Sequence, residues 1–227
     1  MTSIEFNHFL KSISSPSLQV LDASLPKSKY IAIDLSAQNS DLNQIDTTSS
    51  SEFSNYINRF LKEHNAQVAY GGYLEVRSIY DRSSHFKAIT NKRNIHLGLD
   101  LWCDVETPIF APLDGTIHSF KKNTNYGDYG PTIILEHNIF ETRFYTLYGH
   151  LSLNSIENLE VGQEFKQGEQ IATLGNATVN GDYPPHLHFQ IIRNIQGNFG
   201  DYPGVCTKED LVFYSENCPD PNLLFGL

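Results

Sequence analysis

The hydrophobic period of the sequence changes at about residue 67, and this change constrains the fold more than any other feature. From there onward apolar and polar residues alternate in short segments, and turn-forming residues recur about every 8 to 12 positions, as is typical of an antiparallel β domain. Helical segments of about 10 to 15 residues do not separate these stretches, so a parallel sheet with crossover helices is disfavoured. The expected strands are residues 74–80, 97–102, 116–122, 132–137, 143–151, 169–175 and 186–192.

The first part of the chain differs, because its apolar residues recur at helical spacing. Phe6 and Leu10 belong to a short amphipathic helix that should end at Pro16. Ser49 and Glu52 have the spacing of a capping box, which predicts the start of a second helix. A strand-like stretch, YIAIDL, lies between the two helices. No catalytic motif is apparent in this part, so a supporting or docking role is expected.

These patterns together predict the organisation of the chain. A length of 227 residues fits one large domain, or one domain with a small additional element. We therefore expect an all-β catalytic domain at residues 67–227, formed by a small antiparallel sheet or sandwich. A short α-rich extension at residues 1–66 should precede it.

The composition limits the partners. A formal net charge of −10 argues against nucleic acid and anionic membrane surfaces, since both require a basic patch. No apolar run approaches the roughly 18 residues of a membrane span, so membrane insertion is not expected. The sequence sets no oligomeric state.

The compartment is inferred from the N-terminus and the cysteines. The first residues lack a basic region followed by an apolar region, as a signal peptide would have, so a cytoplasmic location is expected. Three cysteines without CxxC spacing favour reduced thiols, although a bridge between Cys206 and Cys218 stays open.

Histidine is the remaining source of chemistry, because the common hydrolase and nucleotide-binding motifs HExxH, GxSxG, GxxxxGK[ST] and GxGxxG are absent. His186 and His188 form an HxH pair in a strand-like run. A period of two places both rings on one face, about 6.6 Å apart along the backbone, where they could contribute to a metal site.

A second pair, His96 and Asp100, lies four residues apart in IHLGLDLW. In a fully extended strand this separation is about 13 Å, too far for both side chains to reach one Zn²⁺ ion. A bend is therefore required, and Gly98 is the residue best able to supply it. With one imidazole of the HxH pair, these residues would form a two-histidine, one-carboxylate zinc site with an open fourth position, as catalytic zinc sites have.

The order of the motifs resembles the lysostaphin/LytM-type zinc endopeptidases. The matching segments are HLGLD, the Asp-Gly turn, LYGHLS, GQEFKQGEQIATLG and PHLHFQ, and they span about residues 70–195. The flanking segment GGYLEVRSIYDRSSHF resembles a branch in which such domains also occur fused to class III aminotransferase and kinase-like modules.

The resemblance implies a zinc-bearing groove and assigns five roles. By the family motif, His96, Asp100 and His188 correspond to the metal ligands, and His150 and His186 correspond to the two catalytic histidines. A bound Zn²⁺ would lower the pKa of its water toward about 7 and polarise a scissile carbonyl. The two catalytic histidines, expected to titrate near neutrality, would move the protons.

The resulting expectation is a zinc metalloendopeptidase that acts on peptides or on peptidoglycan-derived substrates. The alternative is a non-hydrolytic binding or regulatory module on the same fold. Trp102 and the tyrosines are expected to serve packing rather than a substrate groove. The remaining histidines have no motif partner and are expected at the surface: His8, His64, His85, His118 and His137.

Overall fold

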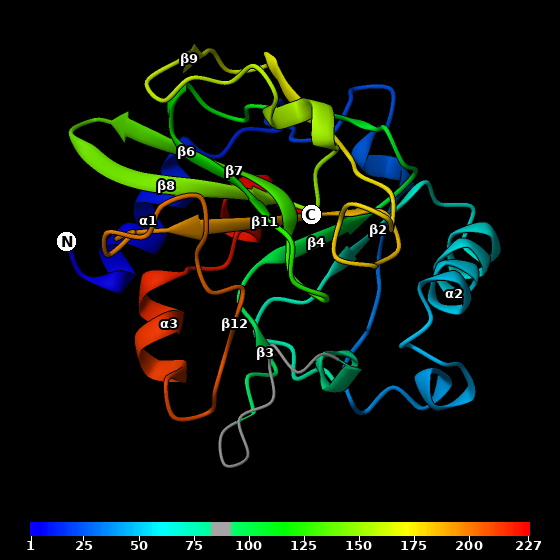
Figure 1. Cartoon of the computed structure of the whole chain (residues 1–227). Helices are drawn as coiled ribbons and strands as arrows, with labels where there is room; N and C mark the ends of the chain where they lie inside the picture. Colours follow the sequence, from blue (N-terminus) through cyan, green and yellow to red (C-terminus); the bar gives the residue numbers. More distant parts are fainter. Residues whose placement is uncertain (83–91) are drawn as a thin grey trace.

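The computed structural model describes residues 1–82 and 92–227, and its central element is a large twisted sheet (Figure 1). In spatial order the strands are β1 (Tyr30–Ala32), β2 (Val68–Gly71), β4 (Leu99–Trp102), β11 (His186–Ile192), β8 (Thr142–Gly149), β7 (Gly130–Ile139), β6 (Gly115–Asn123) and β9 (Glu164–Phe165). Two small antiparallel pairs accompany it, β5 (Pro108–Phe110) with β10 (Gln170–Thr173) and β3 (Ile95–His96) with β12 (Val205–Cys206). The helices are α1 (Ser3–Ile13), α2 (Ser50–Glu63), α3 (Leu211–Asn217) and α4 (Asn222–Phe225).

The fold is mostly β, but the sheet is mixed rather than purely antiparallel. β1 pairs in parallel with β2, with Tyr30 opposite Val68, while the other pairs of the large sheet are antiparallel. The connection between β1 and β2 contains α2, and it is long enough for the crossover that a parallel pair requires. The expected purely antiparallel sheet is therefore wrong at this edge, where the first part of the chain supplies a strand.

The expected strand at residues 74–80 is also wrong. Only an isolated bridge between Val76 and Ile95 forms there, and a 3₁₀ turn (Ile79–Arg82) follows. Leu74 has a left-handed backbone with φ of 55°, which interrupts an extended chain. The end of the chain is not all-β either, because residues 211–225 form α3 and α4, and Leu224 and Phe225 of α4 lie in the core.

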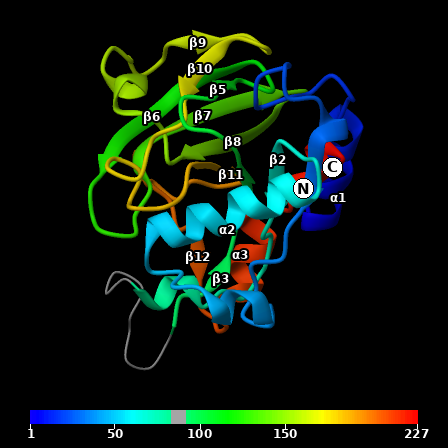
Figure 2. The ribbon, with the colours of Figure 1, turned by 90° about the vertical axis from the view of Figure 1, so that its right-hand side faces the viewer.

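Both N-terminal helices begin and pack as their apolar positions predict. The Thr2 and Ser49 side chains cap α1 and α2. In α1, Phe6 packs edge-on against Phe144 of β8, with ring centroids 5.8 Å apart. In α2, Phe53 contacts Trp102 of β4 at 5.4 Å. Figure 2 shows α2 from the side on which it covers the edge of the sheet near β2. None of the helices in the described residues combines the length and apolar character that a membrane crossing requires.

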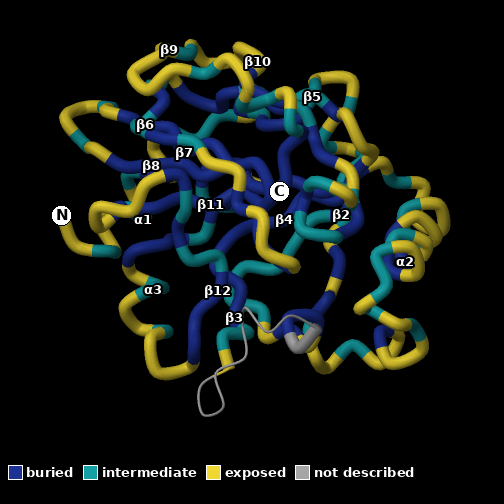
Figure 3. Tube along the Cα trace, viewed as in Figure 1, coloured by how far each residue is buried: buried dark blue, intermediate teal, exposed yellow. Residues whose placement is uncertain are grey.

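The central strand β11 has polar side chains on one face and core side chains on the other. Leu187, Phe189 and Ile191 join the main hydrophobic cluster, whereas His186, His188 and Gln190 occupy the alternate positions. The whole strand is buried, in agreement with the dark centre of Figure 3. Polar groups at such a position require partners, because water does not reach them.

Candidate metal centre

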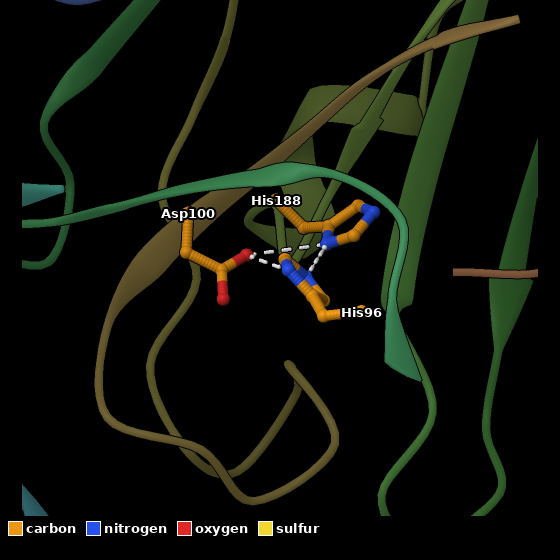
Figure 4. A group of neighbouring side chains, drawn as sticks. All are labelled: His96, Asp100 and His188. Atoms are coloured by element: carbon orange, nitrogen blue, oxygen red, sulfur yellow. Dashed lines mark hydrogen bonds and ion pairs between the residues drawn. The ribbon is translucent and has the colours of Figure 1, made fainter. Parts of the chain in front are cut away.

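Three side chains from β3, β4 and β11 meet at one point, as Figure 4 shows. His96 Nε2 lies 2.8 Å from His188 Nδ1, and Asp100 Oδ1 lies 3.2 Å from each of these nitrogens. All three residues are at least 97% buried. We call His96, Asp100 and His188 the metal triad.

The donor set of the metal triad fits a zinc ion. Ligand atoms about 2.0–2.2 Å from a tetrahedral zinc are about 3.3 Å apart, close to the observed separations. His96 Nδ1 donates to the Gly72 carbonyl at 2.9 Å, so its Nε2 has a free lone pair. Two imidazole nitrogens and a carboxylate oxygen face one another in a buried space, an arrangement that suits a bound cation.

Gly98 lets the chain bring His96 and Asp100 together. β3 ends at His96 and β4 starts at Leu99, so the extended backbone is broken at the expected position. A Cβ atom on Gly98 would lie 2.6 Å from His188 Cε1, so glycine is also needed for the close approach of this ring. The predicted bend is confirmed, and the cross-strand pairing of His188 with Asp100 completes the metal triad.

Arg77 is a buried partner of the metal triad that the motifs did not reveal. Its Nη1 lies 2.5 Å from Asp100 Oδ2, and its Nε lies 2.5 Å from Glu75. Burial raises the pKa of Asp100, but His96 and Arg77 outweigh this effect and hold that pKa well below its usual range. Asp100 is thus ionised, with Oδ1 facing the two imidazoles. The only signal in the sequence is an arginine in an otherwise strand-like stretch, which does not distinguish it from a surface residue.

His150 and His186 flank the metal triad with their rings 4.2 Å apart between centroids. His186 Nδ1 donates to the Pro184 carbonyl at 2.8 Å, and His150 Nδ1 donates to the Asn180 carbonyl at 2.7 Å. Each ring therefore has an unprotonated Nε2, and that of His186 lies 3.9 Å from Asp100 Oδ1.

The expectation that both flanking rings titrate near neutrality is wrong for this arrangement. Burial lowers the pKa of His186 to about 4 and holds the pKa of His150 well below its usual range. Both rings are therefore neutral at pH 7 and are acceptors for a proton.

A cavity of about 230 Å³ lies beside these residues and is lined in part by aromatic side chains. The ring of Trp102 stacks on His186 with centroids 3.8 Å apart, and Tyr129 and Tyr183 also line the cavity. All three are buried, and Trp102 and Tyr129 belong to hydrophobic clusters, as Tyr148 does, so the expected packing role is confirmed while these side chains also line the cavity.

The other histidines vary in burial. His8 and His64 are exposed and His118 is half-buried. His137 is fully buried, contrary to expectation, and lies 2.8 Å from the Asp114 carbonyl and 2.7 Å from the Thr146 hydroxyl. His85 lies outside the described residues. The cysteines Cys103, Cys206 and Cys218 are free and buried.

Comparison with known proteins gives a family match for the segment that contains the metal triad. Residues 94–199 match the model of peptidase family M23. The matched segment, just under half of the chain, is thus similar to a peptidase family M23 domain. The match includes the metal triad, His150 and His186, while Arg77 lies before it.

The curated relatives that match this chain include proteins named metalloprotease and peptidoglycan DD-endopeptidase. The chain is 33% identical over 102 residues to an uncharacterized metalloprotease of Haemophilus influenzae, a match that covers 45% of this chain and 19% of that protein. It is 32% identical over 107 residues to the peptidoglycan DD-endopeptidase ShyC of Vibrio cholerae, covering 47% of this chain and 22% of ShyC. The match thus spans about a fifth of the length of these relatives. Among solved structures, the catalytic domain of lysostaphin from Staphylococcus simulans is 25% identical, with a TM-score of 0.38 over 54% of this chain and 80% of that one.

Proposed function

We propose that the protein is a zinc-dependent metalloendopeptidase that hydrolyses peptide amide bonds. The observation that carries this proposal is the buried metal triad inside the segment that matches peptidase family M23, with two further imidazoles facing the same cavity. A structural zinc site is normally closed by four protein ligands, whereas this one has three ligand candidates beside a cavity. The arrangement suits catalysis better than structural support.

The metal triad would hold the zinc through His96 Nε2, Asp100 Oδ1 and His188 Nδ1. When bound, zinc supplies Lewis acidity that activates water and polarises the scissile carbonyl. Arg77 keeps Asp100 ionised and occupies its other oxygen. The carboxylate is thereby held in one orientation.

His150 and His186 are proposed as the catalytic histidines that move protons. Because both are neutral at pH 7, the Nε2 atom of one of them would accept the proton that water loses, and the resulting imidazolium would donate it to the leaving amine. Asp100 Oδ1, 3.9 Å from His186 Nε2, stabilises the positive charge that His186 would carry. No glutamate is required as the base.

The proposed substrate is a small soluble peptide or a peptidoglycan-derived fragment. A cavity of about 230 Å³ lies below the roughly 300–1,000 Å³ of sites that enclose drug-sized ligands. A net charge of −10 gives no long-range attraction to a carboxylate-rich polymer. A cytoplasmic location remains a prediction.

The proposal is tested by the metal content and turnover of the purified chain. We expect about one zinc per chain in the wild type and hydrolysis of at least some members of a peptide and muropeptide library. His96→Ala, Asp100→Ala and His188→Ala should each lose the zinc, while the exposed His64→Ala serves as a control that keeps it. Zinc retained at the wild-type level in all three triad variants would refute the ligand assignment. Stoichiometric zinc with no turnover on any substrate would instead favour a binding or regulatory module.

A further inference from the structure

Gln190 is a fully buried polar residue on the same face of β11 as His186 and His188, two positions after His188. An amide removed from water must have hydrogen-bond partners for both its oxygen and its nitrogen. Its partners include His188 itself, and they connect the metal triad to the C-terminal part of the chain.

The orientation of the Gln190 amide is fixed by an atom that can only accept. Its Nε2 donates to the Pro203 carbonyl oxygen at 3.1 Å and to the Cys218 sulfur at 3.2 Å. A carbonyl offers no hydrogen, so the flipped amide would place two oxygens face to face. Gln190 Oε1 must therefore point at His188, and it lies 3.0 Å from His188 Nε2.

This orientation selects one tautomer of His188. Because Gln190 Oε1 only accepts, His188 Nε2 must carry the proton and donate it. The lone pair is then on Nδ1, the atom that lies near His96 Nε2 and Asp100 Oδ1. The Tyr129 hydroxyl is a weaker candidate partner, since it lies 3.4 Å from the same Nε2.

The two residues that hold Gln190 lie after the M23 match, which ends at residue 199. Cys218 follows directly after α3 and is fully buried. Burial raises the pKa of its thiol to about 12, so the sulfur is a neutral acceptor for the amide. Pro203 belongs to the segment that leads to β12 and also lines the cavity.

We propose that Gln190 is a positioning residue that presents His188 to the metal through Nδ1, and that Pro203 and Cys218 of the C-terminal segment hold it for this role. The inference rests on the proposed zinc site. It gives the residues after the M23 match an indirect part in metal binding, through Gln190 and His188. Partners of this kind orient a ligating histidine, and their loss weakens metal affinity about 10- to 100-fold.

The test is the zinc affinity of variants at Gln190, measured by competition with a chromophoric chelator. Gln190→Met keeps the volume but removes the acceptor, so its Kd for zinc should rise about 10- to 100-fold. Gln190→Glu can accept the same proton from His188 and, as a neutral carboxyl, donate to the Pro203 carbonyl, so it should restore affinity to within about threefold of the wild type. Tyr129→Phe is the matched control and should leave the Kd within about twofold.

A second measurement reports on the tautomer rather than on stability. Long-range ¹H–¹⁵N NMR of the histidine rings should show the proton on Nε2 of His188 in the wild type and in Gln190→Glu, but not as a single tautomer in Gln190→Met. If Gln190→Met fails to fold, Cys218→Ala takes its place, because it removes one contact that holds the amide and should also raise the Kd.

The outcomes separate this inference from the proposed function. A wild-type chain that binds no zinc would refute the proposed function. A wild-type chain that binds zinc, together with a folded Gln190→Met (or Cys218→Ala) variant of equal affinity, would overturn the positioning role alone. A larger loss in Tyr129→Phe than in Gln190→Met would transfer the role to Tyr129.

Discussion

His150 has a left-handed backbone conformation with φ of 64°, which a residue other than glycine adopts rarely. Three hydrogen bonds enforce it: the backbone nitrogen donates to the Tyr129 carbonyl at 2.8 Å, the Gly175 nitrogen donates to the His150 carbonyl at 2.9 Å, and the ring donates to Asn180. Such a conformation persists only where the surroundings determine it fully, and it occurs often at functional sites. The position of the His150 ring is therefore set by the backbone.

Removing either flanking imidazole should separate catalysis from metal binding. His150→Ala and His186→Ala should retain zinc, because neither ring belongs to the metal triad, while turnover falls about 10²-fold or more as proton transfer is lost. Zinc content and kcat measured on the same preparations check this. Loss of zinc in His186→Ala with retention in His188→Ala would show that the roles within the HxH pair are reversed.

Gly98→Ala should damage the metal triad through one methyl group. The new Cβ would lie 2.6 Å from His188 Cε1 and 2.8 Å from the Phe189 carbonyl oxygen, so the imidazole must shift away from its place. We expect zinc affinity to fall about tenfold, as for a disturbed ligand support, and stability to fall by about 1–3 kcal/mol, as for an overpacked core. Chelator competition and thermal melting of the zinc-free chain measure the two effects.

The control for Gly98→Ala is Gly115→Ala in β6. Its Cβ would lie 2.8 Å from His137 Nδ1, a similar clash with a histidine ring outside the metal triad. Gly115→Ala should lose stability without losing zinc affinity. Equal losses of affinity in both variants would attribute the effect of Gly98→Ala to general destabilisation.

At the scale of elements, strands with regular alternation could be predicted from the sequence and segments shaped by tertiary contacts could not. β11 has the expected bounds because His186–Ile192 alternate apolar and polar positions with no break. Residues 74–80 are also expected to form a strand, yet Glu75 contacts Leu35 and Arg77 pairs with Glu75 and Asp100, and this buried ion pairing outweighs strand propensity. The parallel pairing of β1 depends on where α2 packs, which no local pattern contains.

The same limit applies to the candidate site. The five histidine and aspartate positions followed from motif order, and the structure brings them together, while their roles remain predictions. The partners that orient them did not follow from the motifs, because the Gly72 carbonyl is backbone and Gln190 resembles any polar residue of a strand.

Within β7, the buried His137 should make stability depend on pH. Burial lowers its pKa to about 4 in the folded chain, against 6.5 when exposed. Between these values the unfolded chain binds a proton that the folded chain does not, so stability falls as pH falls from about 6.5 to about 4, by about 3 kcal/mol in total from this group. His137→Gln should flatten this part of the stability curve.

The comparison is made by chemical denaturation at several pH values, with both chains free of zinc. The other buried histidines contribute equally to both chains, so the difference in slope between wild type and His137→Gln isolates His137. Parallel slopes would show that folding does not lower the pKa of His137, so that the ring takes up its proton in the folded chain as readily as in the unfolded one.

At the scale of the whole molecule, residues 1–66 are proposed as an extension that completes the β domain. Deleting them would remove β1 from the sheet and would uncover the surfaces that Phe6 and Phe53 cover on Phe144 and Trp102. We expect lower solubility and a lower melting temperature, because large apolar side chains would become exposed. A truncated chain that melts at the temperature of the full chain would make the extension a docking arm instead.

The last prediction concerns the size and state of the substrate. The metal triad, His150 and His186 are each at least 95% buried, and the cavity they face has a volume of about 230 Å³. A cross-linked wall polymer would have to bring a long strand to these side chains, whereas a short peptide needs only the cavity. The charge of −10 adds repulsion from a surface rich in carboxylates.

We therefore expect zinc-loaded protein to cleave soluble peptides or muropeptides with a higher kcat/KM than intact sacculi, in a side-by-side assay at equal concentrations of scissile bonds. The zinc-free Asp100→Ala variant supplies the background rate. Salt screens charge repulsion, so a higher salt concentration should remove the part of the difference in kcat/KM that repulsion causes. The difference in kcat/KM that persists at high salt would reflect access to the cavity. Efficient release of fragments from intact sacculi, with no activity on the soluble substrates, would contradict this prediction and indicate that the protein is a cell-wall hydrolase.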